Sequence, residues 1–79
     1  MMNNMFNFKN KVAVITGGAR GIGKCIAEKF REAGAVVCVI DLLDNDYFVG
    51  DLADKQALEA FAAKVIADHG HVDYLVHNA

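Results

Sequence analysis

Three glycines in the spacing Gly-x-x-x-Gly-x-Gly, at Gly17, Gly21 and Gly23, are the residues of this 79-residue chain best suited to hold a ligand. Without a Cβ atom, the backbone turns sharply and approaches a phosphate closely. The unpaired N–H groups at the start of a helix, together with the helix dipole, favour a negative charge. The segment from Thr16 to Gly23 therefore predicts a binding site for a diphosphate.

The elements on either side of the glycines support this interpretation. Residues 12–15 (VAVI) form an apolar run typical of a strand that is buried on both faces. After the glycines, an apolar stripe with helical spacing predicts a helix facing the core, formed by Ile22, Ile26, Phe30 and Ala33. A glycine-rich turn between a strand and a helix favours a nucleotide site far more than glycines alone.

A second buried strand, residues 36–40 (VVCVI), is followed by Asp41, which lies 18 residues after Gly23. In dinucleotide-binding folds, an acidic residue about 20 residues beyond the glycines accepts hydrogen bonds from the ribose hydroxyls. Asp41 is the predicted ribose ligand; the alternative is a solvated residue that starts a loop. The strand, the helix and the second strand together predict a β-α-β unit.

These residues resemble the short-chain dehydrogenase/reductase family, whose motif Thr-Gly-x-x-x-Gly-x-Gly is matched from Thr16 to Gly23. Asp51 and Leu52 look like the acidic and hydrophobic pair of the family, in which the carboxylate contacts the adenine amino group. The motifs occur in the family's order along the chain. The match is therefore more specific than the glycines alone.

The end of the chain, residues 75–79 (LVHNA), is similar to the end of the family's fourth strand. That strand is usually followed by Asn-Asn-Ala-Gly, and His77 stands here in place of the first Asn. The resemblance implies cofactor contacts at Thr16, Gly17, Arg20, Gly21, Ile22, Gly23, Asp41, Asp51, Leu52, Asn78 and Ala79.

The predicted fold is α/β, a Rossmann-type parallel sheet in the strand order 3-2-1-4 that is truncated after its fourth strand. We expect residues 1–10 to be a short N-terminal segment and residues 11–79 to be a partial NAD(P)-binding Rossmann domain. A second helix is predicted before the last strand, with Asp54 as its N-cap and Gly70 at its end. The stretch from Leu42 to Asp46 is too short for the helix that most family members carry there.

Arg20 and Asp41 give opposite indications about the cofactor. In family members that use NADP, a basic residue just before the middle glycine often holds the 2′-phosphate, and Arg20 has that position. A carboxylate at Asp41 repels the same phosphate, because like charges in close contact raise the energy. The sequence therefore favours NAD over NADP.

The chain carries no predicted catalytic residue. The resemblance implies a catalytic Ser and a Tyr-x-x-x-Lys pair downstream of the position where this chain ends. Tyr47 and Tyr74 have Asp51 and Asn78, not Lys, four residues later, and both are expected to be structural. We expect the 79 residues alone to be inactive.

Composition excludes several classes of partner. The formal net charge of −2 argues against general attraction to nucleic acid or to anionic membranes. Hydrophobic runs are shorter than the ~20 residues that span a bilayer, and residues 1–10 lack the features of a signal peptide, so a cytoplasmic location is expected. Cys25 and Cys38 are predicted to be reduced thiols on buried faces, with a reactive Cys25 as the alternative.

Two functions follow from these features. The first is the cofactor-binding N-terminal part of a short-chain oxidoreductase, which transfers hydride between NAD(P) and an alcohol or carbonyl substrate. The alternative is a non-catalytic, truncated nucleotide-binding module. Under either interpretation the strand at residues 74–77 is left at an open sheet edge, which predicts self-association.

Overall fold

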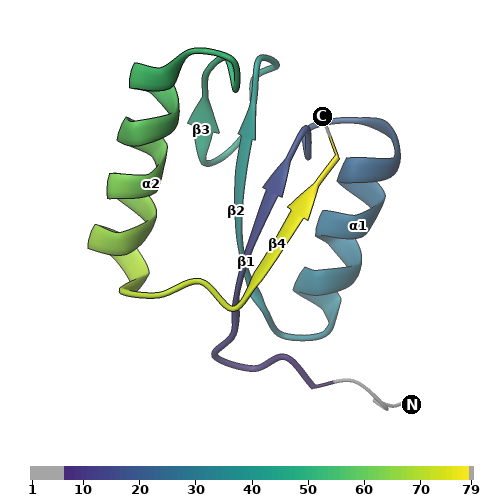
Figure 1. Ribbon diagram of the computed structural model, residues 1–79. Coiled ribbons are helices and arrows are strands. Elements are labelled where there is room, and N and C mark those ends of the chain that lie inside the picture. Colours follow the sequence, from purple (N-terminus) through teal and green to yellow (C-terminus); the bar gives the residue numbers. More distant parts are fainter. Residues whose placement is uncertain (1–6, 79) are drawn as a thin grey trace.

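The strands form one parallel sheet in the order β3-β2-β1-β4, as the sequence predicted. The computed structural model describes residues 7–78. Its elements along the chain are β1 (Val12–Thr16), α1 (Gly21–Glu32), β2 (Val36–Asp41), β3 (Phe48–Val49), α2 (Lys55–His69) and β4 (Tyr74–His77). Figure 1 shows α1 and α2 on opposite sides of the sheet.

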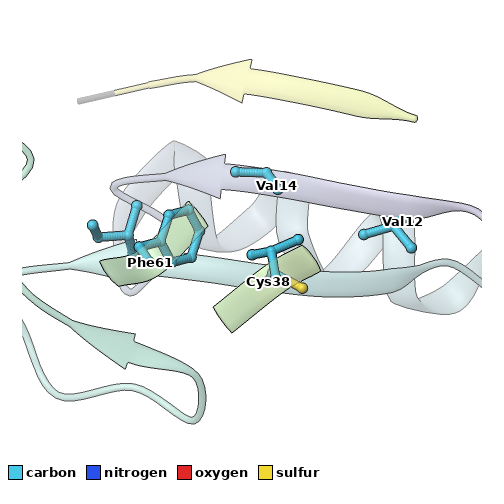
Figure 2. Close-up of a cluster of buried hydrophobic side chains, with 6 residues drawn as sticks. Val12, Val14, Cys38 and Phe61 are labelled. Carbon is cyan, nitrogen blue, oxygen red and sulfur yellow. The ribbon is translucent and has the colours of Figure 1, made fainter. Parts of the chain in front are cut away.

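Side chains that alternate along the central strands fill two separate cores. On one face, Val14 of β1 and Cys38 of β2 pack against Phe61 and Val65 of α2, and Figure 2 looks onto this face of the sheet with part of α2 cut away. The residues between them point to the other face, where α1 covers the sheet. Because both faces are covered, the central strands are apolar throughout rather than alternating with polar residues.

The helix boundaries confirm the capping signals in the sequence. The side chain of Asp54 accepts a hydrogen bond from the backbone N–H of Gln56 at 3.0 Å and so caps α2. Gly70 ends α2 in the left-handed conformation, with φ of 82°. Between β2 and β3 the described chain forms a short loop without a helix, in agreement with its length.

Two predictions about α1 were wrong. Ile22, expected in the core, is 73% exposed, and Cys25 is exposed rather than buried. Gly23 and Ala27 are the fully buried residues of α1, and Ile26 and Phe30 pack against the same core, as the stripe predicted. The prediction for Cys38 was right, because its thiol is fully buried, and burial raises the pKa of this thiol.

The described end of the N-terminal segment packs against the fold. The backbone N–H of Phe8 donates to the carbonyl of Ala33 at 2.8 Å. The ring of Phe8 lies 5.4 Å from the ring of Phe30 on α1 and 5.3 Å from that of Tyr74 on β4. None of the helices within residues 7–78 combines the length and the apolar character needed to cross a membrane.

Candidate functional site

All four parallel strands end at the same edge of the sheet, and a cavity opens there. The chain runs outward from β1 to β2 and β3, then returns across the sheet to β4, so the direction reverses between β1 and β4 (Figure 1). In open α/β sheets, ligands bind at such a reversal, outside the carboxyl ends of the strands. The cavity has a volume of about 510 Å³ and is lined by Gly17, Arg20, Gly21, Ile22, Asp41, Leu42, Gly50, Asp51, Leu52 and Asn78.

The turn from β1 into α1 brings the backbone to the floor of this cavity. Gly21 begins α1 with φ of 60°, a conformation that L side chains rarely adopt. Gly23, in the first turn of α1, has no room for a side chain, because a Cβ atom there would lie 2.2 Å from the carbonyl oxygen of Gly17. The two glycines therefore satisfy different requirements, one of conformation and one of space.

The start of α1 is open to an anion. Arg20 is the N-cap residue in an extended conformation, and its side chain makes no capping hydrogen bond. The first turn of α1 contains no acidic residue. Because the N–H groups of the first helical residues have no partner within a helix, those of Gly21 to Gly23 remain available at the positive end of the helix dipole.

The end of β4 is tied to the glycine turn by three polar side chains. The hydroxyl of Thr16 accepts a hydrogen bond from the backbone N–H of Asn78 at 2.8 Å. The side-chain amide of Asn78 donates to the carbonyl of Gly17 at 3.1 Å. Nδ1 of His77 lies 3.3 Å from the Thr16 hydroxyl. Thr16 therefore supports the site from behind, whereas Asn78 also lines the cavity.

The carboxylate of Asp41 is held by backbone N–H groups from two loops. Its Oδ1 accepts from Leu43 at 2.9 Å, and its Oδ2 accepts from Ala19 in the glycine turn at 2.9 Å. The Leu43 N–H is the main reason why the pKa of Asp41 lies below its ordinary value, and the Ala19 N–H and the charge of Arg20 add to this effect. The carboxylate is therefore fixed in position and charged at neutral pH.

The structure gathers most of the predicted contact residues around one cavity. Gly23 and Thr16 lie behind its lining, and Ala79 lies outside the described residues. Leu42 and Gly50 line the cavity but were not among the predicted residues. Each is adjacent in sequence to a predicted carboxylate, and the convergence of parallel strand ends is the signal that could have identified them.

The two tyrosines lie away from this cavity. The hydroxyl of Tyr47 donates to Asp68 on α2 at 2.8 Å, and Lys64 lies 4.5 Å above its ring. The ring of Tyr74 packs against those of Phe8 and Phe30. Within residues 7–78, no cluster of three or more His, Cys, Asp or Glu side chains is arranged to hold a metal ion.

Comparison with known proteins decides the family. The family model for short chain dehydrogenases matches residues 11–79. The chain belongs to the short-chain dehydrogenase family. Among its relatives, the short-chain dehydrogenase reductase ATA1 of Arabidopsis thaliana is 36% identical over 90 aligned positions, which cover 100% of this chain and 33% of that protein.

Two further members of the family are similar to this chain. The NAD-dependent glycerol dehydrogenase of Listeria innocua is 33% identical, with 94% of this chain and 34% of that protein covered. A metagenomic short-chain oxidoreductase, solved in complex with NADP, is 34% identical with a TM-score of 0.83, covering 90% of this chain and 39% of that one. The chain thus spans about a third of the length of these curated short-chain dehydrogenases. The matches do not favour the alternative of a non-catalytic module.

Proposed function

We propose that these residues are the cofactor-binding part of an NAD-dependent oxidoreductase that interconverts an alcohol and a carbonyl compound. The observation that carries the proposal is the cavity at the strand ends, where an uncapped helix start and a fixed carboxylate face the same space. Its volume of about 510 Å³ is in the ordinary range for a small-molecule site. Residues 11–79 form the partial dinucleotide-binding domain in this proposal.

The residues present fit a dinucleotide. The N–H groups of Gly21, Ile22 and Gly23 hold the diphosphate. A ligand can approach the backbone at Gly21, because the space where a Cβ atom would lie has no other atom within 4 Å. Ile22, exposed at the start of α1, supplies an apolar wall. When bound, the nicotinamide supplies the hydride chemistry, and the protein orients the cofactor and excludes water.

The adenosine half lies between Asp41 and the residues after β3. Asp41 accepts hydrogen bonds from the ribose hydroxyls, Asp51 contacts the adenine amino group, and Leu52 and Asn78 complete that side of the cavity. The family resemblance adds Ala79, which lies outside the described residues, to these contacts.

NAD is the preferred cofactor in this proposal. Both Asp41 oxygens are already fixed by backbone N–H groups, so the carboxylate cannot turn away from a 2′-phosphate without breaking them. Arg20, at the edge of the same cavity, interacts with the diphosphate instead. NADP is the competing cofactor, because the metagenomic relative was solved in complex with it.

The catalytic Ser, Tyr and Lys belong to a segment that these 79 residues do not contain. The described tyrosines have other partners, since Tyr47 is bonded to Asp68 and Tyr74 lies among aromatic rings. Reading the coding sequence past Ala79 tests this part of the proposal. A Tyr-x-x-x-Lys downstream supports the oxidoreductase, and its absence contradicts it.

Titration calorimetry of the 79-residue chain with NAD and with NADP tests the binding site directly. We expect saturable binding of the wild-type chain that is tighter for NAD than for NADP. In an Asp41→Ser variant we expect the ratio of the two affinities to move toward one or to favour NADP. A chain that is folded by circular dichroism and binds neither dinucleotide contradicts the proposal. Equal affinities for both, unchanged in Asp41→Ser, contradict the role of Asp41.

The 79-residue chain by itself is also proposed to associate with a second copy through β4. This strand lies at a sheet edge, and Leu75 on it is 68% exposed. Beside it runs an apolar groove of about 340 Å³, lined by Val14, Leu58, Phe61, Ala62, Val65, Ile66, Val72 and Leu75. An open edge next to an apolar groove favours pairing with another chain.

A further inference from the structure

The loop between β2 and β3 is organised by one side chain, that of Asn45. Its Nδ2 donates to the carbonyl of Leu43 at 2.9 Å and to that of Phe48 at 3.0 Å. Its Oδ1 accepts from the N–H of Tyr47 at 2.8 Å and from the N–H of Phe48 at 2.9 Å. A side-chain amide has two donors and an oxygen with two lone pairs, so Asn45 uses its whole hydrogen-bonding capacity on this loop.

These bonds determine which way the Asn45 amide faces. Its oxygen lies against two backbone N–H groups and its nitrogen lies against two carbonyls, so a flipped amide has four mismatched contacts. Neither Ala nor Asp replaces this pattern, because Ala makes none of the bonds and Asp has no donor. The loop is short, and Asn45 supplies the partners that a helix otherwise supplies to the backbone.

The same loop holds the cofactor-selecting carboxylate. The N–H of Leu43 donates to Oδ1 of Asp41 at 2.9 Å, while the carbonyl of Leu43 accepts from Asn45. Leu43 is therefore fixed at both polar groups, by Asp41 at its N–H and by Asn45 at its carbonyl. The backbone of Asp41 is held as well, because its carbonyl accepts a hydrogen bond at 2.9 Å from the N–H of Gly50, the residue after β3.

We propose that Asn45 is a positioning residue for cofactor choice: it holds the loop so that the Leu43 N–H keeps the Asp41 carboxylate directed into the cavity, toward ribose hydroxyls and against a 2′-phosphate. This inference rests on the proposed function and adds to it a residue that does not line the cavity. The Leu43 N–H is also the main cause of the lowered pKa of Asp41, which provides a measurement that requires no cofactor.

The loop has a second anchor that supplies a matched control. The Tyr47 hydroxyl donates to Asp68 on α2, and this bond fastens the end of the loop without involving Asp41 or Asn45. Tyr47→Phe removes that bond and the contact of the hydroxyl with the Cys38 thiol, and it leaves the side-chain bonds of Asn45 and Asp41 in place. If any weakening of the loop alters cofactor choice, Tyr47→Phe changes the NAD preference as the Asn45 variants do. If Asn45 acts through Leu43, Tyr47→Phe leaves the NAD preference unchanged.

The test compares the wild-type chain with Asn45→Ala, Asn45→Ser and Tyr47→Phe. Calorimetry measures the dissociation constants for NAD and NADP, and NMR titration of the Asp41 carboxyl measures its pKa. In Asn45→Ala we expect the NAD preference to fall about tenfold, the size of one lost hydrogen bond to a charged group, and the pKa of Asp41 to rise toward its ordinary value. Asn45→Ser keeps one acceptor and gives a smaller change, and Tyr47→Phe leaves both quantities as in wild type.

Two results overturn the inference. One is an Asn45→Ala chain, or Asn45→Ser if Asn45→Ala does not fold, with unchanged cofactor preference and an unchanged Asp41 pKa. The other is a Tyr47→Phe chain that loses as much preference as Asn45→Ala. If the folded wild type binds neither dinucleotide, the proposed function fails, and the carboxyl titration alone decides: a pKa that stays at its wild-type value in the Asn45 variants overturns the positioning by Asn45, and a raised one supports it.

Discussion

At the scale of single residues, the site depends on which backbone atoms are brought close together. Gly23 lies where the end of β4 meets the glycine turn, since a Cβ atom there would come within 2.5 Å of the Asn78 amide nitrogen as well as close to Gly17. Asn78 is in turn bonded to Thr16 and Gly17. A change at one of these positions therefore moves the backbone that we propose to hold the diphosphate.

Replacing Gly23 with Ala is expected to lower the free energy of unfolding by about 2 kcal/mol or more, because the new methyl group overlaps backbone atoms that cannot move aside. Gly21→Ala is the matched control. A Cβ atom at Gly21 meets no other atom within 4 Å, and its cost of about 1 kcal/mol comes only from the positive φ. Urea unfolding measures both values, and a Gly23→Ala chain as stable as Gly21→Ala contradicts this packing.

Acid is expected to destabilise the fold through the three described aspartates whose pKa is lowered, which are Asp41, Asp73 and, through the hydrogen bond from Lys64, Asp68. The Leu43 N–H lowers the pKa of Asp41, and the Val12 N–H lowers that of Asp73. A carboxyl group whose folded pKa lies below its unfolded value of about 3.9 stabilises the fold above that pH, and this contribution is lost as the pH falls through the folded pKa. The free energy of unfolding should therefore stay level down to about pH 5 and fall below about pH 4.

Urea unfolding checks this dependence when the free energy of unfolding is measured at steps of about half a pH unit, from pH 6 down to the lowest pH at which the chain is still folded. Asp73→Asn should remove part of the fall, because the Asn side chain takes up no proton as the pH falls. Asp44→Asn, at an exposed carboxylate, is the control. A slope that is the same in wild type and in Asp73→Asn shows that this carboxylate does not contribute.

At the scale of helices and strands, caps and periodicity were readable from the sequence, and the orientation of α1 was readable only in part. Asp54 and Gly70 were predicted because capping depends on local chemistry within a few residues. Ile22 was placed in the core as part of the apolar stripe and Cys25 on a buried helix face, and both are exposed. The helix buries Gly23 and Ala27 and packs Ile26 and Phe30 beside them, so part of the predicted stripe faces the sheet and its first residue does not.

The candidate site shows the same division. The glycine turn and Asp41 were predictable because each belongs to a motif of adjacent or regularly spaced residues. Asn45 was not predicted, because its importance comes from four backbone partners that meet only when the loop is folded. The packing of Phe8 against Phe30 and Tyr74 joins three distant parts of the chain and was missed for the same reason.

The cap of α2 is expected to affect stability without affecting cofactor binding. Asp54→Ala removes the bond to the Gln56 N–H and should lower the free energy of unfolding by about 1 kcal/mol. No residue of α2 lines the cavity, so the NAD affinity should be unchanged. Lys55→Ala, which breaks only an exposed ion pair with Glu59, is the control and should cost less than about 0.5 kcal/mol. A large loss of NAD affinity in Asp54→Ala would show that α2 reaches the site.

At the scale of the whole molecule, the sheet ends at two edges of different character. β3 forms one edge and has only the two residues Phe48–Val49. β4 forms the other edge with the four residues Tyr74–His77, beside the apolar groove of α2. A longer edge offers more unpaired backbone groups in a row, and the groove adds apolar area that a partner can cover. Association is therefore expected at β4 rather than at β3.

The two edges allow a matched test of this asymmetry by introducing the same charge at each. Leu75→Lys places an ammonium group at the β4 edge, where Leu75 is 68% exposed, and Val49→Lys does so on β3, where Val49 is 54% exposed. A charge on an edge strand blocks pairing, because the partner must then bury it or lie beside it. Light scattering after size exclusion should show wild type and Val49→Lys at twice the 8.6 kDa chain mass or more, and Leu75→Lys near the mass of one chain. A wild type that stays monomeric at high concentration contradicts the association. Dissociation by Val49→Lys alone would instead place the contact at β3, although this strand has only two residues to pair.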